Sequence, residues 1–210
     1  MDFFLIIISL VILIFSAILH EIAHGFTADR LGDPTARISG RLTLNPLKHL
    51  DPMMSVFIPL MLLLSTQGRF AFGGAKPVPV DPFNLKGGRR DLAFVSLAGP
   101  LTNILIAVIA AAGFHLASYN PSLTILCIIL MIIVDLNLWL AVFNLLPIPP
   151  LDGSKIFALL LPEKDAQVYL KIGEFGTFIL LFLLFVPIGS FSLQSFMSSI
   201  HTILLSLLGL

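Results

Sequence analysis

Residues 3–24 read FFLIIISLVILIFSAILHEIAH, an apolar run that ends in two histidines and a glutamate. A helix that is apolar on every side must be buried in protein or in lipid. About 20 such residues are needed to cross the hydrocarbon core of a bilayer. The run therefore predicts a transmembrane helix over 3–26, and this helix decides the fold class.

The composition of the whole chain agrees with a lipid environment. Hydrophobic residues make up 57% of the 210 residues, charged residues make up 11%, and the mean hydropathy is +1.02. A soluble domain carries roughly 25% charged residues. The formal net charge is zero and no basic block occurs, which argues against nucleic-acid binding. The single cysteine, Cys127, excludes an internal disulfide and the cysteine-rich zinc sites.

Further segments have the composition of membrane crossings: 92–117, 122–146, 172–188 and 194–210. Segment 53–66 is short for a full crossing and contains Pro59, which favours a re-entrant element. We therefore expect an all-α membrane protein, a polytopic bundle of about five to six transmembrane helices with a re-entrant element between the first and second core helices. No repeat or flexible linker divides the chain. The prediction is a single domain over 1–210, with a core at 3–160 and additional transmembrane helices in 172–210.

The positive charges predict the orientation. All twelve Lys and Arg residues lie in 26–91 or 147–171, and the connections around 118–121 and 189–193 hold none. Positive charges favour cytoplasmic loops. We therefore expect a multi-pass protein of the cell membrane with its N-terminus outside. The inner ends of helices 3–26 and 122–146 then lie on the cytoplasmic side.

The HEIAH sequence carries the chemistry. His20 and His24 are four residues apart, so on a helix they project from one face and suit two imidazoles on one zinc ion. Glu21 lies beside them, where a carboxylate can accept a proton from the attacking water. Ionisable groups buried in lipid without a purpose cost several kcal/mol. The pattern predicts zinc hydrolase chemistry; the alternative is an interfacial cluster that merely ends the helix.

A hydrolytic zinc site needs a third protein ligand and one open position. We expect His115 and His201 to be packed or interfacial residues, and His49 to be solvated. Asp135 lies in the middle of a predicted helix and invites a functional interpretation. Pairing with Asn137 or a protonated, lipid-shielded state explains Asp135 equally well, so no role is assigned to it.

Asp152 belongs to the stretch NLLPIPPLDG at 144–153, in which three prolines must break the helix. Irregular backbone at membrane depth is tolerated only where protein or a wet cavity surrounds it. This stretch is therefore a good place to present a carboxylate on the same side of the membrane as the histidine pair.

Four motifs together resemble the site-2 protease family, and they occur in that family's order. They are HEIAHG at 20–25, GGAKPVPV at 73–80, AGPLTN at 98–103 and NLLPIPPLDG at 144–153. The resemblance covers roughly residues 15–160 and is closest to the minimal prokaryotic members without a PDZ domain. It implies that His20, His24 and Asp152 are the ligands of one Zn²⁺ per chain.

The resemblance also implies roles for residues around the metal. Glu21 would be the general base, and Asn103 and Asn144 would assist substrate or transition-state binding. Residues 70–80 would form a membrane-associated β-like element that pairs with an unwound substrate strand. From the residues alone, Asn103 is better explained as an interhelical hydrogen-bonding group without a catalytic part.

The expected function is intramembrane zinc-dependent cleavage of peptide bonds within or near transmembrane segments, as in regulated intramembrane proteolysis. The expected partners are a transmembrane protein substrate and the lipid bilayer. One alternative is a membrane zinc transporter or sensor that uses the histidine pair with Asp135. The outer halves of helices 3–26 and 122–146 offer few polar residues for such a path. A second alternative is a catalytically inactive family member that acts as a scaffold.

Overall fold

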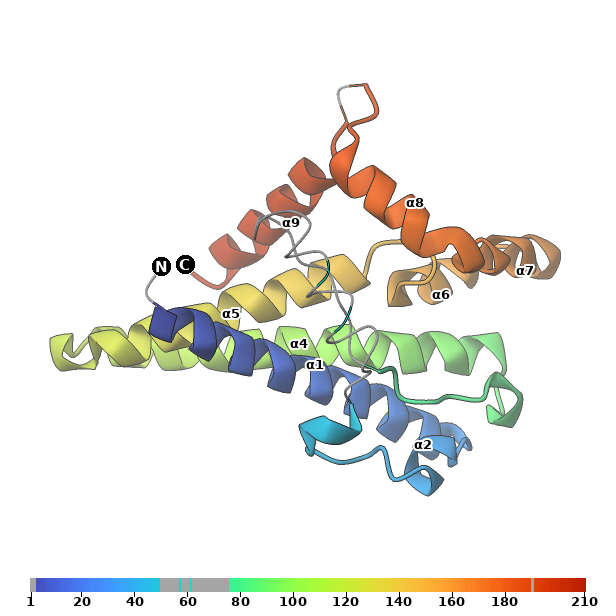
Figure 1. Ribbon diagram of the computed structural model, residues 1–210, viewed down its shortest axis with the longest axis horizontal. Coiled ribbons are helices and arrows are strands. Elements are labelled where there is room, and N and C mark those ends of the chain that lie inside the picture. The colour runs from blue at the N-terminus through green and yellow to red at the C-terminus, as the bar shows by residue number, and fades with distance from the viewer. Residues whose placement is uncertain (1–2, 50–56, 58–60, 62–75, 190) are drawn as a thin grey trace.

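The computed structural model describes residues 3–49, 57, 61, 76–189 and 191–210 (Figure 1). Apart from one bridge between Ile188 and Phe191, the named elements of the described residues are helical. In chain order they are α1 (Phe3–Leu31), α2 (Thr35–Ile38), η1 (Pro46–Lys48), η3 (Pro82–Asn84), α4 (Arg89–Ser118), η4 (Pro121–Leu123), α5 (Thr124–Asn144), α6 (Asp152–Ala158), α7 (Glu163–Lys171), α8 (Gly173–Phe185) and α9 (Leu193–Leu207). The all-α prediction is confirmed. The predicted re-entrant element at 53–66 lies outside the described residues, apart from positions 57 and 61, as does 70–75 of the predicted β-like element.

Three described helices, α1, α4 and α5, are long and apolar enough to cross a membrane. They run side by side through the body of the molecule (Figure 1). Ala107, Ala110 and Ala111 of α4 pack against Val134 and Leu138 of α5. Small residues allow two helix backbones to approach closely, as is common between membrane helices. The outward faces of all three helices keep large apolar side chains exposed, which suits contact with lipid.

The C-terminal helices are shorter than predicted. Helix α8 has 13 residues and α9 has 15, against the about 20 that a full crossing needs. Together α7 and α8 make at most one further span, bent by 73°. The described residues therefore hold three candidate spans, or four if the bent pair counts as one, and five to six crossings are not confirmed. In Figure 1, α8 and α9 form an inverted V beside α5.

Asp135 of α5 joins α9 rather than a neighbour on its own helix. Its Oδ1 lies 3.1 Å from Nε2 of His201, and the His201 ring stacks on Trp139 with 4.6 Å between ring centroids. The alternative of pairing with Asn137 is wrong, because residues two positions apart on a helix point about 200° apart. Asn137 instead faces α1 and α4.

The histidines outside the motif are all in contact with protein. His201 is buried, and His115 Nε2 lies 2.7 Å from the carbonyl oxygen of Leu208, as expected of packed residues. The expectation that His49 is solvated is wrong: this side chain is buried, and its Nε2 lies 2.8 Å from the carbonyl oxygen of Thr43.

Candidate metal centre

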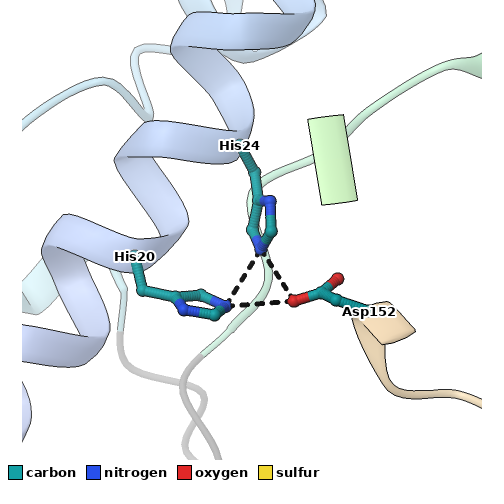
Figure 2. A group of neighbouring side chains, drawn as sticks. All are labelled: His20, His24 and Asp152. Atoms are coloured by element: carbon teal, nitrogen blue, oxygen red, sulfur yellow. Dashed lines mark hydrogen bonds and ion pairs between the residues drawn. The ribbon is translucent and has the colours of Figure 1, made fainter. Parts of the chain in front are cut away.

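Two helices bring the predicted ligands together. His20 and His24 lie one turn apart on α1, and Asp152 is the first residue of α6 (Figure 2). Nε2 of His20 lies 3.0 Å from Nε2 of His24, and Oδ2 of Asp152 lies 3.2 and 3.1 Å from these two nitrogens. The three residues are only 6%, 8% and 7% exposed. Residues far apart in sequence thus meet in one buried cluster.

The loop before α6 explains how Asp152 reaches this cluster. Helix α5 ends at Asn144, and the chain through Pro147, Pro149 and Pro150 stays irregular until α6 begins. This confirms the predicted break of the helix, because proline lacks the N–H that continues the helix ladder. Gly153 allows α6 to pack here: a Cβ at this position would lie 2.2 Å from the carbonyl oxygen of Leu145.

Nδ1 of each imidazole, the nitrogen that points away from the cluster, also contacts protein. Nδ1 of His24 lies 2.7 Å from the carbonyl oxygen of Val95, and Nδ1 of His20 lies 2.6 Å from Oδ1 of Asn103. A carbonyl oxygen only accepts, so Nδ1 of His24 carries the hydrogen and its Nε2 keeps a lone pair. Metal-binding histidines are usually oriented by such contacts.

The donor set fits a zinc ion. Nitrogen lone pairs and a carboxylate oxygen converge, and all three atoms lie within 4.8 Å of one another. Such a group of acceptors repels itself unless a cation lies among its members. Two imidazoles and one carboxylate are an established zinc ligand set, and tetrahedral Zn²⁺ with bonds of about 2.0–2.1 Å separates its ligand atoms by about 3.3 Å. His20, His24 and Asp152 would therefore hold zinc with little movement.

The charge of Asp152 also suits a metal ligand. Burial alone would raise the pKa of this carboxyl group. Each histidine ring, while its Nε2 carries a hydrogen, and then the positive charge of Lys155 hold the pKa of Asp152 well below its usual range. Nζ of Lys155 lies 3.2 Å from Oδ1, the oxygen that faces away from the histidines. Asp152 is therefore ionised at neutral pH.

Gly99 of α4 forms a wall beside the Nε2 atoms of the two rings. A Cβ at this position would lie 2.5 Å from Nε2 of His24 and 2.6 Å from Nε2 of His20. Cβ atoms essentially never make contacts this short, so only glycine lets α4 approach the site. The AGPLTN motif thus contributes both the wall, Gly99, and Asn103, the partner of His20.

Glu21 lies beside the cluster in a cavity of about 410 Å³. Its Oε2 accepts a hydrogen bond of 2.7 Å from the backbone N–H of Val78. Asn144 and Lys155 line the same cavity, and the Asn144 amide donates to the carbonyl oxygen of Leu140, one turn back on its own helix. Asn103 is fully buried on the other side of His20 and is not among the cavity-lining residues.

Residues 76–81 cross the cavity and are tied at both ends. The Arg41 guanidinium donates to the carbonyl oxygens of Lys76 and Pro77 at 2.8 and 3.1 Å. At the other end, Oδ2 of Asp33 accepts from the backbone N–H of Asp81 at 2.7 Å. The contact between Val78 and Glu21 lies between these two ties. The 76–81 segment is therefore positioned over the site by charged side chains.

Asp33 itself is fully buried. Burial would raise the pKa of its carboxyl group, but hydrogen bonds from the side chains of Thr35 and Asn84, with others from backbone N–H groups, lower that pKa below its ordinary value. Sequence reasoning missed Arg41, Asp33 and Lys155. One sequence feature, Gly25 directly after HEIAH, reflects the close approach of the 76–81 segment. A Cβ at Gly25 would lie 2.8 Å from Cγ1 of Val78.

Comparisons with known proteins agree with this geometry. The model for "Peptidase family M50" matches residues 120–187. The chain is 38% identical over 190 residues to "Putative zinc metalloprotease YwhC" of Bacillus subtilis (strain 168), covering 86% of this chain and 81% of the relative. It is 36% identical over 169 residues to "Putative zinc metalloprotease Rip2" of Mycobacterium tuberculosis (strain H37Rv), covering 80% of this chain and 62% of the relative.

No solved structure shows a significant match to this chain. The identity to YwhC extends over most of both proteins, and the apolar helices indicate a membrane protein. The chain therefore belongs to peptidase family M50, the site-2 protease family, and is a membrane metalloprotease with zinc as its cofactor.

Proposed function

We propose that this protein hydrolyses peptide bonds within or near the transmembrane segments of other membrane proteins, as in regulated intramembrane proteolysis. One observation carries the proposal: His20, Glu21 and His24 lie on α1, a helix long and apolar enough to cross a membrane, and the two histidines meet Asp152 of α6 there. A protease built for soluble substrates has no need to place its reacting groups on such a helix.

In this proposal His20, His24 and Asp152 hold the zinc ion. When bound, zinc supplies a Lewis acid that polarises the scissile carbonyl and makes water a nucleophile near neutral pH. The protein contributes an ordered ligand set, because each histidine has its second nitrogen in contact with protein. The positive charge of Lys155, 3.2 Å from Oδ1 of Asp152, favours the ionised form of the third ligand.

Glu21 acts as the general base and then as the general acid. Its carboxylate accepts a proton from the attacking water and passes that proton to the leaving amine. The hydrogen bond from the Val78 N–H occupies Oε2 and leaves Oε1 to carry the proton. Val78 thereby orients the carboxylate.

Asn144 is the proposed contact for the developing oxyanion. One hydrogen of its amide is donated to Leu140, and the second is available to a peptide in the shared cavity. A substrate peptide must be extended here, because a helix hides its carbonyl groups in its own hydrogen bonds. Residues 76–80 are the described part of the element proposed to lie along the substrate strand, and Pro77, Val78 and Val80 line the cavity.

The test is the Glu21→Gln variant, purified in detergent with a model transmembrane substrate. Glutamine keeps the size of the side chain and the contact with Val78 but cannot accept the proton. We expect wild-type zinc content and loss of cleavage, measured by mass spectrometry of the products. Cleavage at the wild-type rate by this variant would disprove the mechanism.

A matched pair of aspartate variants tests the ligand set. Asp152→Ala should lower the zinc content of the purified protein, because it removes one of three ligand atoms. Asp135→Ala should leave zinc content unchanged, because Asp135 pairs with His201 instead. Zinc loss only in the Asp135→Ala variant would support the rival zinc transporter or sensor.

We also propose that the protein crosses the cell membrane several times, with its N-terminus outside and its site near the cytoplasm. The support is the confinement of Lys and Arg to 26–91 and 147–171. With Cys127 replaced by serine, cysteines placed at the exposed positions Ser118 and Lys86 report the two sides. A membrane-impermeant thiol reagent on intact cells should label position 118 and spare position 86; the reverse result would invert the topology.

A further inference from the structure

Behind His20, three buried polar side chains form a chain of hydrogen bonds across three helices. Asn103 of α4 lies 2.6 Å from Nδ1 of His20 through its Oδ1, and its Nδ2 donates to Oδ1 of Asn137 on α5 at 2.9 Å. Nδ2 of Asn137 donates to Oγ of Ser16 on α1 at 2.9 Å. Asn103 and Asn137 are 0% exposed and Ser16 is 4% exposed, so no solvent replaces these partners.

A backbone carbonyl group at one end of this series of hydrogen bonds determines which group donates and which accepts. Nδ2 of Asn137 also lies 2.9 Å from the carbonyl oxygen of Ile133, and a carbonyl oxygen only accepts hydrogen bonds. The amide nitrogen of Asn137 must therefore face Ile133 and Ser16, and its oxygen must face Asn103.

The remaining orientations follow in sequence. The side-chain oxygen of Asn137 can only accept, so the amide nitrogen of Asn103 must point toward it and donate. The side-chain oxygen of Asn103 then faces His20. That oxygen accepts, so Nδ1 of His20 carries the hydrogen. Nε2 of His20 is then the unprotonated nitrogen, the form that can bind a metal. A backbone carbonyl on α5 thus determines which nitrogen of His20 faces the metal site.

The two histidines reach the same state by different routes. His24 contacts the carbonyl oxygen of Val95 directly, and this partner cannot reverse. His20 contacts an amide group, which presents either an oxygen or a nitrogen depending on its rotation. Without Asn137 to bind its nitrogen, Asn103 is free to turn that nitrogen toward His20 and so favour the wrong tautomer.

We propose that Asn137 is a positioning residue of the metal site, which acts through Asn103 to fix the tautomer and orientation of His20, with Ser16 as its second acceptor. The proposal rests on the ligand set given under the proposed function. It assigns Asn103 to the support of a ligand rather than to contact with substrate. It also separates Asn137 from Asp135, which lies only two residues away and serves the contact with α9.

We call the hydrogen-bonded path from Asn137 through Asn103 to His20 the relay. Zinc affinity, measured by competition with a chromophoric chelator, tests this relay without depending on catalysis. Loss of a residue that orients a metal ligand typically weakens metal binding about 10–100-fold. We expect a loss in this range for Asn103→Leu and about 10-fold for Asn137→Leu. Ser16→Ala should weaken binding less, because the Ile133 carbonyl still orients Asn137.

Matched controls exist on the same helices. Ser9 on α1 and Thr102 on α4 each donate to the carbonyl oxygen one turn back and do not contact His20. Ser9→Ala and Thr102→Val should leave zinc affinity unchanged. A loss in either control as large as in Asn137→Leu would overturn the relay, because the effect would then come from helix packing.

The decisive measurement is the double variant Asn103→Leu with Asn137→Leu. If Asn137 acts through Asn103, the double variant should bind zinc as weakly as Asn103→Leu alone, and additive losses would overturn the proposal. If Asn137→Leu does not fold, Asn137→Ser and Ser16→Ala take its place in the same cycle. All affinities are measured in the Glu21→Gln background. If Asn137→Leu leaves the zinc affinity of this background unchanged, the relay is refuted and the proposed ligand set is not. If replacing His20 leaves the zinc affinity unchanged, the proposed ligand set itself is refuted.

Discussion

Gly99 shows how one missing side chain makes the site possible. The Gly99→Ala variant places a methyl group only 2.5 and 2.6 Å from the Nε2 atoms of His24 and His20, and these short contacts are with ring atoms of buried histidines. We expect loss of bound zinc and of cleavage, measured by metal analysis and by product formation. A repacked site would bind zinc normally, which would contradict this prediction.

The control lies on the same helix. At Gly113 of α4 a Cβ would lie 3.5 Å from the nearest atom, a methyl carbon of Leu130, which is an ordinary van der Waals contact. Gly113→Ala should therefore keep zinc and activity. Since alanine favours helix over glycine by about 1 kcal/mol, this variant should not lose stability.

At the residue scale, the sequence predicts what depends on local spacing. The four-residue interval of His20 and His24 places both rings on one face of any helix, and the structure has them there. The contact between Asn103 and Asn137 depends on how α4 and α5 are rotated about their own axes. No interval within one helix carries that information, so this part of the site needed the structure.

Among the elements, the connection between α1 and α4 depends on Asp33. Its side chain binds the backbone at Asp81 and the side chain of Asn84, so it joins the end of α1 to η3. Asp33→Asn is nearly the same size but presents an amide nitrogen to donors. We expect a loss of about 1–3 kcal/mol in the free energy of unfolding at neutral pH, because buried donors lose their acceptor.

The pH dependence of this loss has a definite sign. The pKa of Asp33 is lower in the folded protein than in the unfolded chain, so the carboxylate stabilises the fold above the unfolded pKa of about 3.9. That contribution disappears as pH falls through the lower, folded pKa. The difference in unfolding midpoint between wild type and Asp33→Asn should therefore shrink below about pH 4.

Asp29 offers the comparison for this measurement. It pairs with the exposed Arg37 at 3.0 Å, and exposed ion pairs contribute about 0–1 kcal/mol. Asp29→Asn should change the unfolding midpoint little at any pH. An equal effect at Asp29 and Asp33 would mean that net charge, rather than the buried ties of Asp33, sets the response to acid.

Helix boundaries were less predictable than helix existence. Hydropathy correctly marks α1, α4 and α5, where one apolar run corresponds to one helix. The apolar run at 172–188 corresponds to α8, which begins at Gly173 and ends at Phe185, before Pro187. Gly176 packs so closely on Pro149 that a Cβ would lie 2.0 Å from its carbonyl oxygen. This tertiary contact influences where α8 runs, and apolar composition does not contain it.

For the whole molecule, the metal site joins segments that are distant in the chain. His20 and Asp152 are 132 positions apart, so a zinc ion held by the proposed ligands would link α1 to α6. A ligand that binds only the folded state stabilises it by about 2.7 kcal/mol at a free concentration of 100 times Kd. Chelation should therefore lower the unfolding midpoint of the whole protein, measured by thermal unfolding in detergent.

The specificity of this effect can be checked in two ways. Added zinc should restore the midpoint, and added magnesium should not, because magnesium prefers oxygen ligands. The Asp152→Ala variant should respond little to the chelator, because it lacks the link to α6. A wild-type midpoint that ignores chelation would show that zinc contributes nothing to the fold.

Arg41 joins two parts of the chain that lie on either side of residues 50–75. Its guanidinium binds the carbonyl oxygens of Lys48 on one side and of Lys76 and Pro77 on the other, and the N–H of Lys76 donates to the carbonyl oxygen of His49. The described residues on either side of 50–75 are thus held close together. An insertion or a deletion between these anchors can alter the length of the intervening stretch without pulling Val78 away from Glu21. Evolution and protein engineering can therefore vary that stretch independently of the contact between Val78 and Glu21.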